Sequence, residues 1–497
     1  MNIQHFIAYL NKQKGWNIEG LYYARIIQWR DWWQGDFAPF HTVKEITLKG
    51  GTTQRPMYRL GMPKRACEDW ASLLLNEKTT LTVQDAATAR WLLGADADQT
   101  GGLLGELDFW AQANRLVELA FRSGTGAFVL NCEGLRVEGG RALPSPEARL
   151  HLDYLPAECI LPITIRHGQV VEAAFASEVT IEGKSCIYLQ THQRTDKGYR
   201  ISNEYFTSRN EAGEEEGYSP APLPKGMAAS FSTGSLLPWF SLLRPAGLKN
   251  RPGGAGLGQA VFAEAIDPAK MCDLAFDNYC RDLYLGGKKV FYSATMLKPT
   301  IAPDGSAHWQ APDDARQQLF VQTEKSDPDA PNDWHEYNPD LRCEQNGRAV
   351  QDALDYFSFK CGLGTRRYRF EAGGIKTATA TEYTGDRQDL VQHANRHQIG
   401  IEGALVGVLR AILWAGRTLL GAAIDPDTPL TVNFDDSYIT DSETRRAQMK
   451  DDCLAGFLPK YRYLSEWYGM SEAEAKAAVR EAAQEASAAP ELSFGEA

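Results

Sequence analysis

The sequence predicts a mixed α+β protein in which helices and antiparallel strands occupy separate stretches of the chain. After residue 148 the hydrophobic repeat changes from the helical type to the alternating type of strands. Further on, a short strand-bearing insertion separates two helical stretches, and one helical repeat is then sustained for about thirty residues, roughly 45 Å. Because 497 residues exceed the size of a single core, we expect more than one substructure.

The N-terminal part predicts helices followed by a sheet. Helical stripes run through 57–75 and 106–122, and the second ends at a glycine-rich breaker. Short apolar runs separated by turns predict antiparallel strands over 148–208. The stretch 225–258 is rich in Pro, Gly and Ser, so we expect it to be a connecting excursion.

The C-terminal half predicts two helices around a small insertion. Asp267 and Pro268 predict an N-cap and a first turn, and the helix that they open stops at the glycines 286 and 287. The second helix, over 347–361, has apolar residues at helical spacing. After the long helix, Ser471 and Glu474 have the spacing of a capping box, which predicts a further helix near the C-terminus.

Charge and cysteine content exclude several classes of protein. A net charge of −12 argues against a protein that grips nucleic acid over a broad basic face, although it suits a conduit past which a polyanion must slide. The nine cysteines show no CxxC pair, so we expect reduced thiols. The N-terminus has no signal-peptide pattern, and the apolar stretch 403–416 is too short to span a bilayer, so we expect no membrane attachment.

Motifs that carry chemistry are incomplete. Lys184 follows a glycine as in a phosphate-binding loop, but Glu178 stands where the motif needs another glycine. His393 and His397 lie one helical turn apart, yet Ala394 replaces the glutamate of the metalloprotease motif. We interpret the two histidines as structural.

Two glycine-associated clusters remain. The glycines 254, 256 and 258 lack the spacing of a dinucleotide fingerprint, and a flexible linker is the preferred interpretation. The acidic cluster at 211–216 matches no ligand spacing and is interpreted as a solvated loop. No nucleophile and base are arranged as in known hydrolases, so we expect no catalytic, cofactor or metal site, and a protein that is not an enzyme.

The segment 361–378 resembles the glycine-rich loop that joins a stem helix to a long helix in portal proteins of tailed bacteriophages, the subunits of the head-to-tail connector. In that family the loop ends in a Lys-Thr-Ala-Thr-Glu-like helix start. Residues 379–382 keep the last part, whereas Lys376 lies two residues upstream of the family's pattern.

Three further stretches, 57–75, 434–437 and 465–474, look like the same family and occur in the same order. The resemblance implies a portal-protein fold with an α/β wing, paired stem helices, a small α/β clip, a long wing helix and a helical crown. The implied boundaries are the N-terminal wing 1–262, stem helix 263–286, clip 287–343, stem helix 344–361, tunnel loop 362–378, long wing helix and return segment 379–437, and crown 438–497.

The resemblance also implies a function. Such proteins form rings, twelve-fold in the virion, at one capsid vertex, and double-stranded DNA passes through them during packaging and ejection. The implied partners are further copies of the chain, the DNA, the terminase, a head-tail adaptor, and the major capsid and scaffold proteins. The implied location is the virion, and the host cytoplasm during assembly.

Two groups of residues are candidates for the channel wall. We expect an acidic face on the stem helices, formed by Asp273, Asp277, Asp282, Asp352 and Asp355, although a solvated face or inter-subunit ion pairs would explain the same residues. We expect the tunnel loop to meet DNA through Arg366, Arg367, Arg369 and Lys376.

Two other functions stay open. A DNA-packaging enzyme would need a phosphate-binding loop or a carboxylate metal cluster, and the sequence shows neither at a recognisable spacing. A capsid or minor head protein would not need the succession of helix, insertion, helix and loop.

Overall fold

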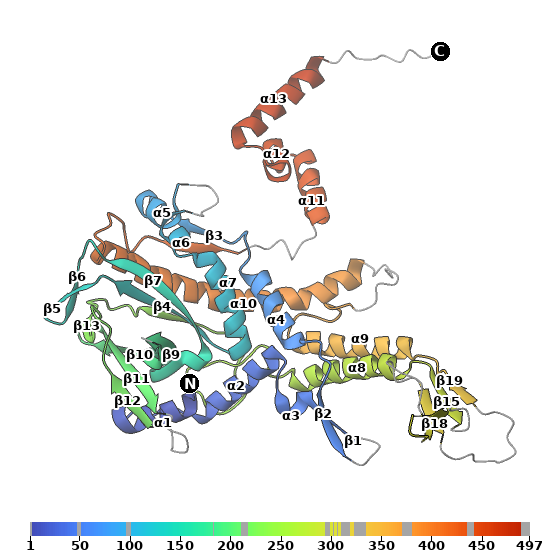
Figure 1. Ribbon diagram of the computed structural model, residues 1–497. Coiled ribbons are helices and arrows are strands. Elements are labelled where there is room, and N and C mark those ends of the chain that lie inside the picture. The colour runs from blue at the N-terminus through green and yellow to red at the C-terminus, as the bar shows by residue number, and fades with distance from the viewer. Residues whose placement is uncertain are drawn as a thin grey trace, which may run out of the picture. The chain divides into compact units, whose positions relative to one another are not determined.

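The computed structural model describes residues 2–46, 51–95, 101–181, 183–209, 217–293, 299–301, 303–305, 307–309, 319–322, 334–369, 380–434 and 442–488. The chain divides into two compact units, Met1–Asn433 and Phe434–Ala497, which are described separately. Helices and mostly antiparallel strands form separate blocks, so the predicted α+β class is confirmed (Figure 1).

The largest sheet of the first unit has eight strands, in the order β5-β6-β13-β11-β10-β9-β8 with β12 paired to β11. Their bounds are β5 (Arg136–Glu138), β6 (Arg141–Leu143), β8 (Ile160–Arg166), β9 (Gln169–Ile181), β10 (Lys184–Thr195), β11 (Gly198–Arg209), β12 (Gly217–Ala221) and β13 (Ser230–Ser232). The strands expected over 148–208 are therefore confirmed. Lys184 opens β10 directly after a turn in which Gly183 has a φ of +78°, so the incomplete phosphate-loop motif is part of a β-hairpin.

The first unit also contains smaller sheets. A three-stranded sheet, β14-β4-β7, and two strand pairs, β1 with β2 and β3 with β20, lie in the first unit. Their bounds are β1 (Thr42–Ile46), β2 (Thr52–Pro56), β3 (Thr80–Val83), β4 (Gly126–Glu133), β7 (Arg149–Pro156), β14 (Phe240–Leu243) and β20 (Leu430–Asn433). Strand β20, at the end of the first unit, thus pairs with β3 of its N-terminal part, at residues 80–83.

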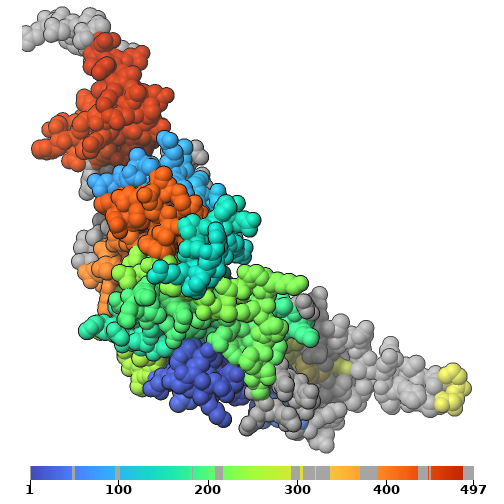
Figure 2. Space-filling view, turned by 90° about the vertical axis from the view of Figure 1, so that its left-hand side faces the viewer, coloured from blue at the N-terminus to red at the C-terminus, as the bar shows by residue number. Residues whose placement is uncertain are grey.

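Helices from the N-terminal third pack against these sheets. Their bounds are α1 (Ile3–Lys14), α2 (Leu21–Gln34), α3 (Ala38–His41), α4 (Met62–Leu74), α5 (Ala86–Leu93), α6 (Gly102–Glu106) and α7 (Phe109–Ser123). The ring of Phe6 in α1 lies 5.4 Å from that of Phe206 and 4.9 Å from that of Tyr218, so α1 lies against β11 and β12 (Figure 2). The helices expected within 57–75 and 106–122 are α4 and α7.

The segment after the sheets contains two paired helices, α8 (Ile266–Leu285) and α9 (Cys343–Lys360). Between them lie β15 (Lys289–Ser293), β16 (Pro299–Ile301), β17 (Ala307–Trp309), β18 (Leu319–Gln322) and β19 (Trp334–Tyr337). Strand β15 pairs with β18 in parallel and with β19 in antiparallel orientation. Figure 1 shows α8 and α9 side by side, with these strands at the end of the pair. The predicted helix, insertion and helix are confirmed as secondary structure.

The N-cap expected at Asp267 is wrong by two positions. Helix α8 begins at Ile266 after Ala265, which makes no side-chain capping bond, and Asp267 instead pairs with Lys270 at 2.8 Å. Pro268 still lies in the first turn, where its missing N–H costs nothing. Asp267 therefore contributes its negative charge to the helix N-terminus rather than a cap.

The long helix α10 (Ala380–Thr418) has 39 residues. Its part from Asp389 to Thr418 is long and apolar enough to cross a membrane by length and composition, so the apolar stretch is longer than the 403–416 expected. However, Ile401, Leu405 and Val408 are fully buried in the first unit, where α10 packs on β14 and β4. Burial in a protein core accounts for this composition without a membrane.

The glycine-rich segment near residue 254 is packed, which corrects the expectation of a flexible linker. A Cβ added to Gly254, whose φ is +58°, would lie 2.2 Å from the ring of Tyr22. The Tyr22 hydroxyl donates to the Gly258 carbonyl at 2.6 Å, and the Gly258 N–H donates to Thr125 at 2.9 Å. The glycines therefore allow the backbone to approach α2 and the end of α7.

The second unit consists of α11 (Ser442–Leu454), α12 (Lys460–Tyr468) and α13 (Glu472–Ala488). The predicted capping box is confirmed, because the Ser471 hydroxyl accepts from the Glu474 N–H at 3.3 Å and the Glu474 carboxylate accepts from the Ser471 N–H at 2.9 Å. Among the described residues of this unit, Ala475 alone is buried. Packing among the described side chains of this unit therefore contributes little to its stability.

Candidate functional site

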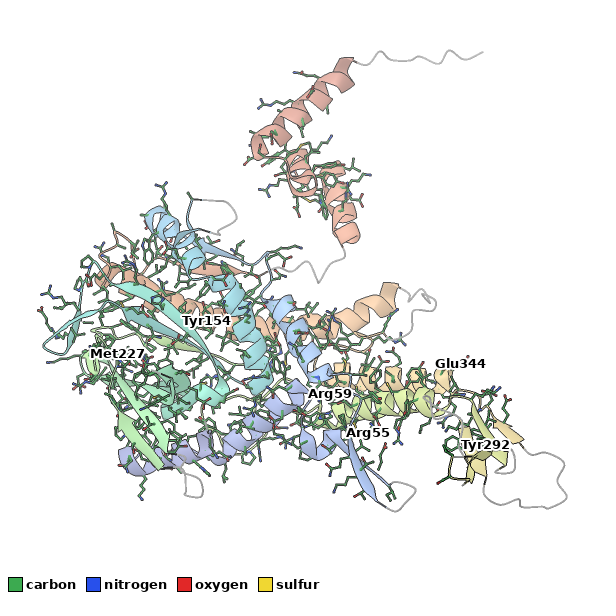
Figure 3. All side chains as sticks on the ribbon, in the orientation of Figure 1. Arg55, Arg59, Tyr154, Met227, Tyr292 and Glu344 are labelled. Carbon is green, nitrogen blue, oxygen red and sulfur yellow. The ribbon has the colours of Figure 1, made fainter. Side chains whose placement is uncertain are left out.

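The candidate site is the α8–α9 pair together with the loop that follows α9. Two aspartates of α8, one helical turn apart, attach the pair to the rest of the first unit. The Asp277 carboxylate accepts from both terminal nitrogens of Arg55 at 2.7 Å and from the Tyr58 N–H at 3.0 Å. Figure 3 shows Arg55 where the β1–β2 pair meets α8. This bidentate geometry is the strongest form of an arginine–carboxylate contact.

The second aspartate, Asp273, is bonded to His41. The Phe37 N–H donates to Nδ1 of His41 at 3.0 Å, which assigns the ring hydrogen to Nε2. That Nε2–H donates to Asp273 at 3.1 Å, and the Leu60 N–H donates to the other carboxylate oxygen at 2.8 Å. The side chains of Asp273 and His41 are both buried, so both oxygens of the carboxylate are satisfied within one chain.

Asp277 ionises more readily than an ordinary aspartate. Burial opposes its ionisation, but the hydrogen bonds from Arg55 and Tyr58 and the charges of Arg55 and Arg281 outweigh burial and lower the pKa of Asp277. The hydrogen bond to Asp277 raises the pKa of Arg55 in turn, although burial opposes this. The pair is therefore fully charged at neutral pH.

Acid should weaken this attachment. The folded pKa of Asp277 lies below the unfolded value of about 3.9, so its stabilisation is complete above that pH and is lost as the pH falls through the folded pKa. We expect the free energy of unfolding of the wild type to decline below about pH 4 more steeply than that of Asp277→Asn. Denaturant titrations at a series of pH values measure this, and equal slopes for the two proteins would contradict the prediction.

The expected acidic face is wrong for Asp273 and Asp277. These residues are only 3% and 5% exposed and are bonded to residues of the same chain, so they cannot line a channel wall as free carboxylates. Asp282 is bonded as well, to Arg342 at 2.8 Å and to Asn346 at 3.0 Å, which joins the end of α8 to the start of α9. The hydrogen bond from Arg342 lowers the pKa of Asp282.

The other two aspartates of the predicted face lie on α9. Asp352 is exposed, and Asp355 is half-buried and accepts from the Gln351 side chain at 2.9 Å. The sequence alone did not reveal that His41 and Arg55 bind Asp273 and Asp277, because they lie more than two hundred residues before α8. The available signal was the placement of Asp273 and Asp277 at i and i+4, on one side of a helix, where two unpaired carboxylates would repel each other.

Helix α8 exposes several large apolar side chains. Met271, Leu274 and Leu285 fall on one side by the helical repeat, and Leu274 is 45% exposed. Large apolar side chains that are exposed along the pair are Met271, Leu274, Leu283, Tyr284, Leu285, Leu341, Tyr356 and Phe359. An exposed apolar surface of this kind is typical of an interface with another protein chain.

The loop after α9 is folded tightly at its start. Gly362 and Gly364 have φ angles of +76° and +79°, and Arg366 has +60°, which a residue other than glycine rarely adopts. The Ser358 hydroxyl donates to the Gly364 carbonyl at 2.6 Å, and the Gln351 side chain donates to the Tyr368 carbonyl at 2.8 Å. The last turns of α9 therefore hold the first part of the loop in place.

Helix α4 fixes the same part of the loop from the other side. The Trp70 indole donates to the Cys361 carbonyl at 3.1 Å, and the buried Asp69 carboxylate lies 3.9 Å from Nε of Arg367. Asp69 also pairs with Arg65 at 3.1 Å. Burial, and then the neighbouring Asp69, raise the pKa of Tyr368.

The four predicted basic residues of the loop thus differ in their surroundings. Arg366, Arg367 and Arg369 are all exposed, and Arg367 in addition lies 3.9 Å from the Asp69 carboxylate. Lys376 lies outside the described residues, as does the whole acidic cluster at 211–216. Sequence analysis identified the loop, but the anchors Asp69 and Trp70 are visible only in the fold.

Of the two histidines of α10, His397 is a packed core residue. His397 is buried, its Nδ1 accepts from the Ala246 N–H at 3.0 Å, and its ring packs 4.8 Å from Trp70. Burial, and then the charges of His393 and Arg396, lower the pKa of His397 to about 3. No group of three metal-ligating side chains occurs among the residues that the structure describes. The interpretation of His397 as structural is confirmed.

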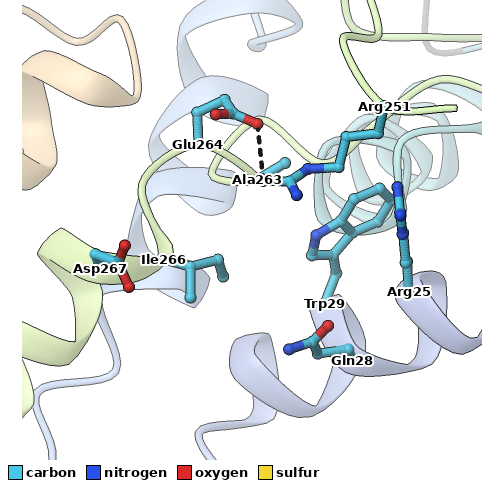
Figure 4. A pocket seen from close by; sticks show the side chains of 8 residues that line it. All are labelled: Arg25, Gln28, Trp29, Arg251, Ala263, Glu264, Ile266 and Asp267. Carbon is cyan, nitrogen blue, oxygen red and sulfur yellow. Dashed lines mark hydrogen bonds and ion pairs between the residues drawn. The ribbon is translucent and has the colours of Figure 1, made fainter.

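A cavity of about 270 Å³ lies beside the first turn of α8 (Figure 4). Arg25 and Arg251 line it together with Glu264 and Asp267, and Arg251 pairs with Glu264 at 3.1 Å. The two cations and two carboxylates balance each other. The charge of the cavity therefore favours neither an anion nor a cation.

The cysteines form no disulfide, and four of them are buried, among them Cys67 and Cys361. Burial raises the pKa of both of these thiols well above the ordinary value. They pack as small apolar side chains rather than as nucleophiles.

Comparisons with known proteins do not assign the chain to a family. No protein-family model matches the chain, and no curated protein matches it. A solved structure that it is similar to is a chain from the neck of a native GTA particle, computed with C12 symmetry, at a TM-score of 0.33 and 14% sequence identity. The alignment covers 81% of this chain and 89% of that chain, and a TM-score of this size assigns neither a family nor a function.

Proposed function

We propose that the chain is the subunit of a bacteriophage portal, a ring at one capsid vertex through which double-stranded DNA is packaged and ejected. One observation carries the proposal: α8 buries Asp273 and Asp277 while Met271 and Leu274 are exposed, and α9 also has exposed large apolar side chains, Tyr356 and Phe359. In a closed ring each copy would cover that surface on its neighbour. At about 25 cal/mol per Å² of apolar surface, such burial would be a main source of ring stability.

The order of elements supports the same function. The sequence resemblance places a clip between two stem helices and a tunnel loop before a long helix, and α8, the strands β15 to β19, α9, the loop and α10 follow each other in that order. The boundary between Asn433 and Phe434 lies close to the start expected for the crown. In this proposal the chain binds and guides DNA and catalyses no reaction.

The contact with DNA rests on the loop rather than on an acidic wall. Arg366 and Arg369 are exposed on a segment whose start is fixed by α4 and α9, so each copy would present the same cations to the duplex. Six to ten phosphate contacts change affinity by roughly 10³ to 10⁵ between low and moderate salt. Few copies can therefore engage DNA at once if the duplex is to move.

The proposed partners are the terminase during packaging, a head-tail adaptor afterwards, and the major capsid and scaffold proteins around the ring. The proposed location is the capsid vertex of the virion, reached from the host cytoplasm. A capsid or minor head protein would share the virion but would not need a ring with a central channel.

Purified protein should therefore form closed rings with a central hole wide enough for a duplex. Size-exclusion chromatography with light scattering gives the mass, and negative-stain electron microscopy shows the shape. Because Leu274 is exposed, Leu274→Glu should leave the monomer folded and shift the protein towards smaller species. The matched control is Leu21→Glu, at an exposed leucine of α2, which should keep the ring. A wild type that remains monomeric under all assembly conditions would overturn the proposal.

A further inference from the structure

A second surface of the first unit is shaped to receive another chain. It is a groove of about 460 Å³ between α10 and the segment that contains β14. On the α10 side it is lined by Ile399, Gly400, Gly403 and Ala404, and on the other side by Pro238 and Arg244. It lies on different elements from the α8–α9 pair.

The charged residue in the lining of the groove is Arg244, which lies with the polar residues Gln169 and Ser241 and has no acidic partner among the described residues. Its guanidinium makes only two long hydrogen bonds, to the Gly256 carbonyl and to the Gln169 side chain, both at 3.3 Å. Burial lowers the pKa of Arg244. A guanidinium stays charged in proteins, so a partly buried one without a carboxylate costs free energy that an incoming anion would recover.

The groove is open on its α10 side. Ile399 in its lining is 74% exposed. The neighbouring α10 residues of the lining are small, and a Cβ added to Gly403 would meet no atom within 4 Å. The groove thus combines open space over small residues, the exposed apolar side chain of Ile399 and a cation without an acidic partner among the described residues.

We propose that this groove receives a segment of a second copy of the chain, which places apolar side chains over Gly403 and Ala404 and a carboxylate on Arg244. The inference rests on the proposed function, since the ring supplies the second copy. The charge argues for this occupant: the chain has 64 acidic against 52 basic residues, so its surfaces offer carboxylates. In a ring, every subunit would present the groove to the same part of its neighbour.

Filling the groove tests the inference. Gly403→Leu adds a side chain where the monomer has open space, and leucine is the stronger helix former, so the monomer should fold as well as the wild type. The matched control is Gly403→Ala, which brings a similar gain in helix propensity but little volume. We expect Gly403→Leu to weaken self-association at least tenfold in analytical ultracentrifugation, and Gly403→Ala to leave it within about twofold.

A second variant tests the charge, and a photo-cross-linker identifies the occupant. Arg244→Met replaces the unbranched aliphatic part of the side chain without the cation and should also weaken self-association. A photo-reactive phenylalanine at position 399 should give a covalent product of two chains. Rings that form equally well with Gly403→Leu and give no such product would overturn the inference while leaving the ring intact.

Two other outcomes are separable. In the first, Arg244→Met keeps the ring, while the ring binds a DNA duplex more weakly and with a smaller dependence on salt concentration. That result would mean that Arg244 binds a DNA phosphate and that no second copy occupies the groove. If the wild type forms no ring, the proposed function itself fails.

Discussion

Replacing Arg55 by alanine should lower the free energy of unfolding of the first unit by about 3 kcal/mol, because the change leaves the Asp277 carboxylate buried without its cation. The side chain of Asp277 is 6% exposed, and the Tyr58 N–H together with the charge of Arg281, which pairs with Glu45, does not replace the bidentate contact. The same change removes the link between the β1–β2 pair and α8. Denaturant unfolding followed by tryptophan fluorescence measures the loss.

An exposed ion pair provides the control. Arg136 pairs with Glu138, and both side chains are more than half exposed, so Arg136→Ala should cost less than about 1 kcal/mol. If Arg55→Ala cost no more than Arg136→Ala, α8 would not be attached through Asp277. A lysine at position 55 should recover only part of the loss, since an ammonium cannot reproduce the bidentate contact.

Replacing Trp70 by alanine should cost about 3 to 5 kcal/mol, the range for removing a large buried aromatic side chain. Trp70 is fully buried, and its ring packs 4.8 Å from that of His397 and 6.1 Å from that of Phe121. It joins α4, α7 and α10 and also holds the Cys361 carbonyl at the start of the loop. The loss should therefore appear both in global unfolding and in faster amide exchange of residues 361–369.

A smaller change at the same position separates the two effects. Trp70→Phe keeps an aromatic ring in the core but removes the donor to Cys361, a bond whose loss costs about 0.5 to 1.5 kcal/mol. Its global stability should lie between those of the wild type and Trp70→Ala. Exchange in 361–369 that is unchanged in both variants would show that α4 does not hold the loop.

Patterns within one element predicted local structure well. The apolar residues Val350, Leu354 and Phe357, at helical spacing, are all buried on α9, and the capping bonds of Ser471 form as the spacing predicts. These features depend on residues three to seven positions apart, so the local sequence contains the information.

The orientation of α8 could not be predicted in the same way. Its sequence shows apolar and acidic positions, and placing the apolar ones inside is the ordinary rule for one chain. The structure instead buries Asp273 and Asp277 beside Ala269 and Cys272 and leaves Leu274 exposed, because His41 and Arg55 supply hydrogen bonds to the two aspartates. A helix whose apolar side is covered by another copy follows a rule that a single sequence does not reveal.

The prediction of a flexible linker at the glycine-rich segment was wrong for a related reason. Composition alone predicts flexibility, whereas Gly254 is required by the ring of Tyr22, which lies more than two hundred residues earlier in the chain. The contacts that fix Arg367 and the start of the loop, from Asp69 and Trp70, are equally distant in sequence. Sequence analysis therefore located the candidate site but not the residues that position it.

The sparse packing of the C-terminal helices α11 to α13 has a thermodynamic consequence. With a single buried side chain among its described residues, this unit gains little from a core of its own, so contacts from outside the unit would add a large share of its stability. If another copy supplies those contacts, the order of the unit should rise with protein concentration, as it does for any segment whose folding is linked by mass action to association.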